Sequence, residues 1–195
     1  MLKLNIGAGP NPLVGWYNVD LHAQVVGVGQ MDATQRFPYP DETFDRIFTE
    51  HMIEHVPYEA GGRMLAECHR VLKPGGRIRI STPDLEWLVS LMIGAIPDGR
   101  LELTRRYVAW ACSNFNPTEP ILPETVVNNF VRAWGHQYIY TRHVLAAQLD
   151  NLGFKNQVWP RIGESDDPEF RELENVGRMP EGFLQLETMT AEAEK

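Results

Sequence analysis

The first twenty residues constrain the fold more than any other part of the chain. An apolar run over residues 2–6 leads directly into the turn Gly7-Ala8-Gly9, and a second apolar run over residues 16–20 ends in the carboxylate of Asp20. A buried parallel strand that ends in glycines lets the backbone approach a ligand closely, and an acid at the end of the next strand can bind both hydroxyls of a ribose. The pattern therefore predicts a nucleotide-type binding site in an α/β sheet.

The spacing of this segment argues against a dinucleotide. Pro12 stands where a third glycine would complete GxGxxG, and Asp20 follows Gly9 too closely for a full helical crossover. Asn11 is a candidate cap for a single helical turn that Pro12 would open. We therefore expect the first crossover helix to be mostly missing and the ligand to carry no phosphates.

Composition limits the size and the partners of the protein. The 195 residues, 43% hydrophobic and 23% charged, suffice for one core, so we expect a single domain over 1–195. A net charge of -8 argues against nucleic acid as a partner. The few clustered arginines are predicted to lie on a solvated strand edge (Arg77, Arg79) and a solvated helix face (Arg105, Arg106).

Cysteine usage and the hydropathy pattern point to a cytoplasmic protein. Cys68 and Cys112 lie inside apolar helical patterns without zinc-ligand spacing, so we expect buried, reduced thiols. No signal-peptide pattern opens the chain, and no apolar run approaches the ~20 residues that cross a bilayer. The sequence predicts no membrane partner.

Hydrophobic periodicity predicts strands that alternate with helices, which is typical of a parallel sheet. We expect the first two long helices to stop at Pro74-Gly75-Gly76 and Pro97-Asp98-Gly99, and residues 191–195 to form a frayed tail. Strands are predicted over residues 2–6, 16–20, 25–29, 44–49, 76–82, 154–159 and 183–189, and helices over residues 60–72, 85–96, 101–115 and 141–152, with a loop at 116–123.

Six segments over residues 2–83, in the family's order, resemble the class I S-adenosylmethionine-dependent methyltransferases. A glycine-rich turn alone would be weak, but the full series in order is specific. The segments are Asn5-Ile6-Gly7-Ala8-Gly9, Gly15-Trp16-Tyr17-Asn18-Val19-Asp20, Met31-Asp32-Ala33, Phe37-Pro38-Tyr39-Pro40-Asp41-Glu42-Thr43-Phe44-Asp45, Glu54-His55, and Arg70-Val71-Leu72-Lys73-Pro74-Gly75-Gly76.

This resemblance implies a Rossmann-like fold with S-adenosylmethionine as cofactor. It implies a mostly parallel, seven-stranded sheet whose last strand inserts antiparallel between the fifth and sixth, with a trimmed first helix. We expect residues 84–140 to form a helical cap insertion that builds the acceptor site. The cofactor-binding residues it implies are Asn5, Gly7, Ala8, Gly9, Asp20, Leu21, Asp32, Ala33, Glu50 and His51.

Simpler interpretations stay open for several of these residues. The family usually places an acid where Asn5 stands, so the cofactor's amino group would meet an uncharged amide. Asp20 could be a surface acid at a strand end. Asp32 could serve only as the first residue of an Asx turn.

The segment from Thr49 to His55 follows a predicted strand, where ligands of open α/β sheets bind. It matches the H-x-x-E-H metalloprotease pattern, but Pro57 leaves no room for the long helix that such enzymes need. The segment resembles more closely the E-x-x-E-H stretch of ubiquinone-type O-methyltransferases, some of which bind a divalent metal there. Glu54 and His55 are therefore candidate metal ligands, and a packed structural histidine is the alternative for His55.

The predicted function is transfer of a methyl group to an oxygen or nitrogen of a small molecule. An oxygen acceptor must lose its proton, and histidine is a common general base near neutral pH. His55 and His136 are the candidates, the latter within an aromatic cluster, Trp134 to Tyr140, that either lines the acceptor site or lies at the surface. A different reaction of the same cofactor, or a non-enzymatic partner subunit, remains as an alternative.

Overall fold

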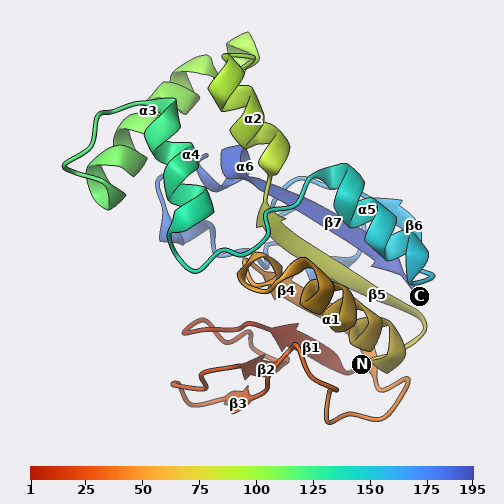
Figure 1. Cartoon of the computed structure of the whole chain (residues 1–195). Coiled ribbons are helices and arrows are strands. Elements are labelled where there is room, and N and C mark those ends of the chain that lie inside the picture. The colour runs from red at the N-terminus through yellow and green to blue at the C-terminus, as the bar shows by residue number, and fades with distance from the viewer.

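The computed structural model describes residues 1–195, which form one mixed sheet with helices (Figure 1). Its strands are β1 (Lys3–Ile6), β2 (Tyr17–Asp20), β3 (Val28–Gln30), β4 (Phe44–Glu50), β5 (Leu72–Pro83), β6 (Lys155–Val158) and β7 (Thr188–Glu194). The strand order is β3-β2-β1-β4-β5-β7-β6. β1 to β5 pair in parallel, and β7 is antiparallel to β5 and β6. The predicted sheet, with its inserted antiparallel strand, is confirmed.

The helices divide into two groups. The α-helices are α1 (Tyr58–Val71), α2 (Leu85–Ile93), α3 (Asp98–Phe115), α4 (Pro123–Arg132), α5 (Arg142–Asn151) and α6 (Leu184–Glu187), and the 3-10 turns are η1 (Ile53–His55), η2 (Pro168–Phe170) and η3 (Val176–Arg178). α1 and α5 lie along one face of the sheet, whereas α2, α3 and α4 gather beyond the carboxyl end of β5 (Figure 1).

The main hydrophobic core lies between the sheet and α1. Met64, Leu65 and Cys68 recur at helical spacing and are fully buried against Ile47 and Ile78 of the sheet. A second buried cluster joins α2, α3 and α4 to the α6 segment. Cys112 belongs to this second cluster, so both thiols are buried and free, as predicted.

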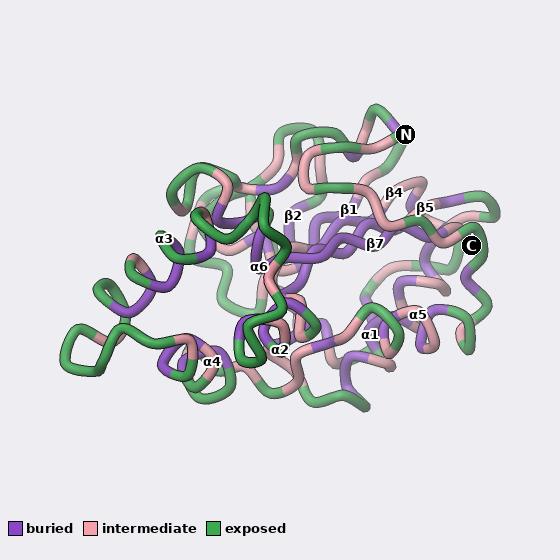
Figure 2. Tube along the Cα trace, turned by 90° about the horizontal axis from the view of Figure 1, so that it is seen from above, coloured by how far each residue is buried: buried purple, intermediate pink, exposed green.

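The opposite face of the sheet is covered by the irregular segment 159–182 rather than by a long helix; Figure 2 shows the buried strands with α1 and α5 on the other side. The side chain of Arg79 points into this layer and is fully buried. Its Nε donates to Glu174 Oε1 at 2.6 Å, and its Nη1 donates to Glu192 Oε1 at 2.5 Å. The predicted solvated strand edge is therefore wrong, whereas Arg105 and Arg106 do lie on an exposed helix face.

Several predicted boundaries also need correction. No helical turn forms at Asn11 and Pro12, so β1 and β2 are joined by an irregular loop. Leu72 is already extended, so α1 ends before the Pro74-Gly75-Gly76 stop, and the left-handed Gly94 ends α2 ahead of Pro97.

The C-terminal segment differs most from expectation. Residues 184–187 are helical, and the strand runs on through Ala191 and Ala193, which are each 1% exposed. The predicted frayed tail is therefore wrong, because its alanines fill the core between β5 and β6. The sequence analysis also left out α4, whose buried positions include Val126 and Phe130.

No helix in the structure combines the length and the hydropathy that a bilayer span requires.

Candidate functional site

The turn after β1 has the backbone geometry that the sequence predicts. Gly7 and Gly9 adopt φ values of +75° and +50°, which favour glycine. A Cβ built on Gly7 would lie 2.6 Å from the Cγ of Met52, so no larger residue fits without a shift. The amides of Gly7 and Ala8 both donate to Val19 of β2, which fixes the turn beside the second strand.

Asp20 lies at the rim of the same turn. Its Oδ2 accepts a hydrogen bond from the Gly9 amide at 2.9 Å, and its Oδ1 accepts one from the His22 amide at 2.8 Å. A cavity of about 600 Å³, here called the Asp20 cavity, opens above these residues. It is also lined by Leu21, Asp32, Ala33, His51, His55 and Trp134.

Asp32 forms an Asx turn and also lines the Asp20 cavity. Its Oδ1 accepts hydrogen bonds from the amide of Thr34 at 2.8 Å and from the hydroxyl of Thr34 at 2.7 Å, which is an Asx turn. The Thr34 hydroxyl, followed by the amide, holds the pKa of Asp32 below its usual value. The carboxylate is therefore ionised and also faces the Asp20 cavity.

A second cavity, of about 450 Å³, lies on the other side of the glycine turn and is here called the Glu50 cavity. The Nδ2 of Asn5 donates to Asn18 Oδ1 at 2.9 Å, and no protein group donates to its Oδ1. Burial raises the pKa of Glu50, whose carboxylate accepts from the Asn175 amide. Ala8, Gly9, His51 and Arg178 line the same cavity.

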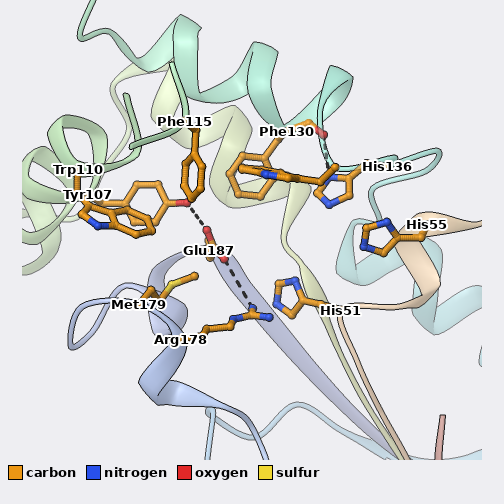
Figure 3. Close-up of a pocket in the computed structure, with 11 residues that line it drawn as sticks. His51, His55, Tyr107, Trp110, Phe115, Phe130, His136, Arg178, Met179 and Glu187 are labelled. Atoms are coloured by element: carbon orange, nitrogen blue, oxygen red, sulfur yellow. Dashed lines mark hydrogen bonds and ion pairs between the residues drawn. The ribbon is translucent and has the colours of Figure 1, made fainter. Parts of the chain in front are cut away.

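A third cavity, of about 350 Å³, lies between the carboxyl edge of the sheet and α3 and α4 (Figure 3). We call it the aromatic cavity, because five aromatic rings line it: Tyr107, Trp110, Phe115, Phe130 and Trp134. The polar and charged side chains in its wall are His51, His55, His136, Arg178 and Glu187.

His51 lines all three cavities. It follows β4 directly with a φ of +47°, a conformation that is uncommon for a residue other than glycine. Its Nδ1 lies 3.1 Å from Glu54 Oε1, and its Nε2 lies 2.8 Å from Thr188 Oγ1. Both ring nitrogens are thus held by side chains, which fixes the ring where the cavities meet.

Glu54 is fully buried beneath this ring. Its Oε2 accepts from the hydroxyl of Thr82 at 3.0 Å. Burial raises the pKa of Glu54, but the charge and hydrogen bond of His51, a backbone hydrogen bond and the charge of His55 together hold this pKa below its usual value. Glu54 is therefore an ionised carboxylate that orients His51.

The structure brings together the two predicted catalytic histidines. The rings of His55 and His136 are 4.9 Å apart, edge to face, and both line the aromatic cavity. Burial lowers the pKa of His136, whose Nδ1 lies 2.8 Å from the carbonyl oxygen of Phe130. His136 is therefore neutral at pH 7, with Nε2 left to accept a proton.

The same histidines meet the geometric requirement for a metal site. One ligand atom each from Glu54, His55 and His136 can be chosen so that all lie within 4.8 Å of one another. A histidine whose other ring nitrogen donates to a backbone carbonyl, as His136 would to Phe130, is the usual arrangement around a bound metal. His136 is therefore a third candidate metal ligand, beside the predicted ligands Glu54 and His55.

Sequence reasoning missed Tyr107, Arg178 and Glu187. Tyr107 lies in the apolar pattern of α3, so its hydroxyl gave no signal. Arg178 lies on η3, in a segment without periodicity, and Glu187 lies where a strand was predicted. Only the tertiary structure brings these three distant residues to one cavity.

Comparisons with known proteins agree with this fold. Residues 4–80 match the methyltransferase domain family. A methyltransferase from Archaeoglobus fulgidus matches with a TM-score of 0.57 and 16% identity, over 99% of this chain and 85% of that one. One from Mesorhizobium loti matches with a TM-score of 0.57 and 18% identity, over 100% of this chain and 90% of that one. Both are described as dependent on S-adenosylmethionine. None of the curated proteins compared matches the chain.

The fold is therefore that of the class I methyltransferases. The chain also matches the methyltransferase domain family over residues 4–80. It is an enzyme that transfers methyl groups, and its cofactor is S-adenosylmethionine. The donor set fits this cofactor, since Asp20 suits the ribose hydroxyls and the free Oδ1 of Asn5 suits an ammonium group.

We expect Asp20→Ala to weaken S-adenosylmethionine and S-adenosylhomocysteine alike, by about ten to a few hundredfold, because charge-assisted hydrogen bonds to the ribose would be lost. Titration calorimetry measures both affinities. Glu102→Ala, at a position 79% exposed on α3, is the control and should bind normally. Unchanged affinity in Asp20→Ala would remove the ribose assignment.

Proposed function

We propose that the protein transfers the methyl group of S-adenosylmethionine to an oxygen or nitrogen of a small molecule bound in the aromatic cavity. The cofactor would occupy the Asp20 and Glu50 cavities, which meet at the glycine turn. The cap residues 84–140 would form most of the acceptor site. A volume of about 350 Å³ suits a small organic molecule.

One observation carries this proposal: the aromatic cavity adjoins the Asp20 cavity through shared residues. His51, His55 and Trp134 line both. An acceptor among the aromatic rings would therefore lie next to a cofactor held at the glycine turn. Methyl transfer needs such adjacency, because in-line alignment of the reacting atoms alone can lower the barrier by roughly 7 to 11 kcal/mol.

His55 and His136 are the proposed proton acceptors. Both face the cavity, and His55 also faces the Asp20 cavity, where the reactive end of the cofactor would lie. Burial lowers the pKa of His136, and its ring centroid lies 4.9 Å from that of His55. A divalent metal held by Glu54, His55 and His136 is the second arrangement that the geometry supports, and it would lower the pKa of an acceptor hydroxyl instead.

Trp110→Ala tests the acceptor site separately from the cofactor site. Trp110 lines the aromatic cavity and neither of the other two. We expect turnover to fall roughly ten to a hundredfold through loss of acceptor alignment, with cofactor affinity within about twofold of the wild type. Steady-state kinetics and calorimetry measure the two effects.

Trp134→Ala provides the contrast. Trp134 also lines the Asp20 cavity, so this substitution should impair both turnover and cofactor binding. If turnover of Trp110→Ala fell only in proportion to the loss of folded protein, Trp110 would be a packing residue and the acceptor would bind elsewhere.

Deuterated-methyl S-adenosylmethionine tests the proposed function directly. Incubating the protein and this cofactor with a small-molecule extract should give a product that gains the labelled methyl group in a mass spectrum. The Asp20→Ala variant should form far less of it. Consumption of the cofactor without labelled product would favour a different reaction, and no consumption at all would contradict catalysis.

A further inference from the structure

The aromatic cavity contains a single carboxylate, that of Glu187. Glu187 ends α6, immediately before β7, and is 5% exposed. In Figure 3 its carboxylate lies between Tyr107 and Arg178, at the centre of the residues that line the cavity. A carboxylate beneath five aromatic rings requires an explanation, since burying a charge is costly unless it is paired.

Its two protein partners satisfy it only in part. The hydroxyl of Tyr107 donates to Glu187 Oε2. Arg178 Nη2 lies 3.9 Å from Oε1, which is too far for a hydrogen bond, and no protein group donates to Oε1. One carboxylate oxygen therefore remains available to a ligand in the cavity.

Arg178 also has a second environment. It lines the Glu50 cavity, next to Asn175 and Glu50. The positive charge of Arg178 helps to ionise Glu50, although burial dominates the pKa of that carboxyl. Arg178 is thus shared between the cavities rather than committed to Glu187.

The walls add a second feature that favours a cation. Ammonium groups are attracted to the faces of Trp, Tyr and Phe rings, and more strongly where water is excluded. In Figure 3 the rings of Phe115 and Phe130 lie above the carboxylate. Trp110 and Trp134 also line the cavity. Aromatic faces around one carboxylate match the chemistry of an organic amine.

We propose that the acceptor is an amine with an apolar or aromatic body, bound through its ammonium group by Glu187 and the surrounding rings. This inference rests on the proposed function and narrows it to nitrogen. Glu187 then binds and positions the amine, and the proton passes to one of the proposed histidine bases, His55 or His136, in the wall of the same cavity.

The step balances without another reactant. The ammonium passes one proton to His55 or His136, which leaves a nitrogen lone pair. That pair forms the new nitrogen–carbon bond, while the bond from the methyl carbon to sulfur breaks and its electrons return to sulfur. Burial raises the pKa of Glu187 above its usual value, although His51, Tyr107 and Arg178 lower it, and an ammonium group bound beside the carboxylate would lower this pKa further.

The test compares two small probes of similar shape by titration calorimetry, with the protein free of cofactor. 2-Phenylethylamine is a cation at neutral pH, and 2-phenylethanol is uncharged. We expect the wild type to bind the amine at least about tenfold more tightly, as a charge-assisted hydrogen bond implies. Glu187→Gln should lose this preference while binding 2-phenylethanol within about twofold of the wild type, and Glu102→Gln, on the exposed face of α3, should keep it.

Arg178→Gln gives an independent test of opposite sign. Removing the competing cation should strengthen binding of 2-phenylethylamine by about threefold or more and leave 2-phenylethanol unchanged. This result stands even if Glu187→Gln does not fold. Equal affinity of the wild type for both probes, an undiminished preference in Glu187→Gln, or no gain in Arg178→Gln would overturn the inference.

The binding test is separate from turnover. A protein that prefers the amine but transfers no labelled methyl group would refute the proposed function alone. A protein that methylates hydroxyl compounds and shows no preference for the amine would refute this inference alone.

Discussion

Replacing His55 by alanine is expected to lower kcat by about a hundred to ten thousandfold while leaving cofactor binding intact, which is the range for loss of a general base. His55 lies where the aromatic and Asp20 cavities meet, so its ring can reach an acceptor placed beside the methyl group. Steady-state kinetics measure the loss, and calorimetry with S-adenosylhomocysteine measures cofactor affinity.

The pH dependence separates this role from a packing role. The loss in His55→Ala should shrink as the pH rises, because the acceptor then loses its proton unaided. A purely structural defect would not shrink in this way. His136→Ala is the matched variant. The ring centroid of His136 lies 4.9 Å from that of His55, but His136 does not line the Asp20 cavity, so this variant should lower kcat by less.

A chelator distinguishes the metal arrangement from the base. If Glu54, His55 and His136 hold a divalent ion, chelation should abolish activity, and Mg²⁺ or Zn²⁺ should restore it. Full activity of His55→Ala at neutral pH, in the presence of chelator, would contradict both roles and leave His55 as a packed side chain.

Arg79→Ala is expected to destabilise the fold by about 3 to 5 kcal/mol, which is the cost of removing one member of a buried ion pair. Glu174 and Glu192 are both at least 96% buried, and each makes a hydrogen bond to Arg79 of 2.6 Å or less. Without Arg79, the buried carboxylate of Glu174 would lose its cationic partner, and Glu192 would keep only its ion pair with Arg77. Urea denaturation measures the change in free energy of unfolding.

Arg105→Ala is the control for this prediction. Its side chain is 69% exposed, and its ion pair with Glu102 is 4.0 Å long, so the variant should change stability by less than about 0.5 kcal/mol. Equal stability of Arg79→Ala and Arg105→Ala would show that the buried network contributes little.

The Arg79 network also reaches the functional site. Arg79 binds Glu174, and the next residue, Asn175, donates its amide to Glu50 at 3.1 Å. Arg178 follows in the same segment. Arg79 therefore holds in place the segment that supplies Arg178 to two cavities.

The parts of the fold that the sequence predicts are those with local signals. The strand before Gly7 and the carboxylate of Asp20 lie next to one another because short-range patterns fix the ends of two adjacent strands. Glu54 and His55 follow shortly after β4 in the sequence, and this position correctly predicts that they lie at the carboxyl edge of the sheet. Thr141 caps α5 and Gly153 follows its end with a φ of +89°, as turn chemistry predicts.

The parts that the sequence could not predict depend on tertiary contacts. Arg79 looks like any charged strand residue until segment 159–182 supplies Glu174. The alanines at 191 and 193 look like a tail, yet they belong to β7, which pairs with β5 on one side and β6 on the other. The aromatic cavity joins α3, α4 and η3, whose residues are far apart in the sequence.

A crystal structure with S-adenosylhomocysteine would test the central claim most directly. We expect the ribose hydroxyls at the carboxylate of Asp20, the amino group near Asn5 in the Glu50 cavity, and the sulfur beside His51, facing the aromatic cavity. A cofactor bound away from the Gly7 to Gly9 turn, or a sulfur separated from the aromatic cavity by protein, would contradict the account.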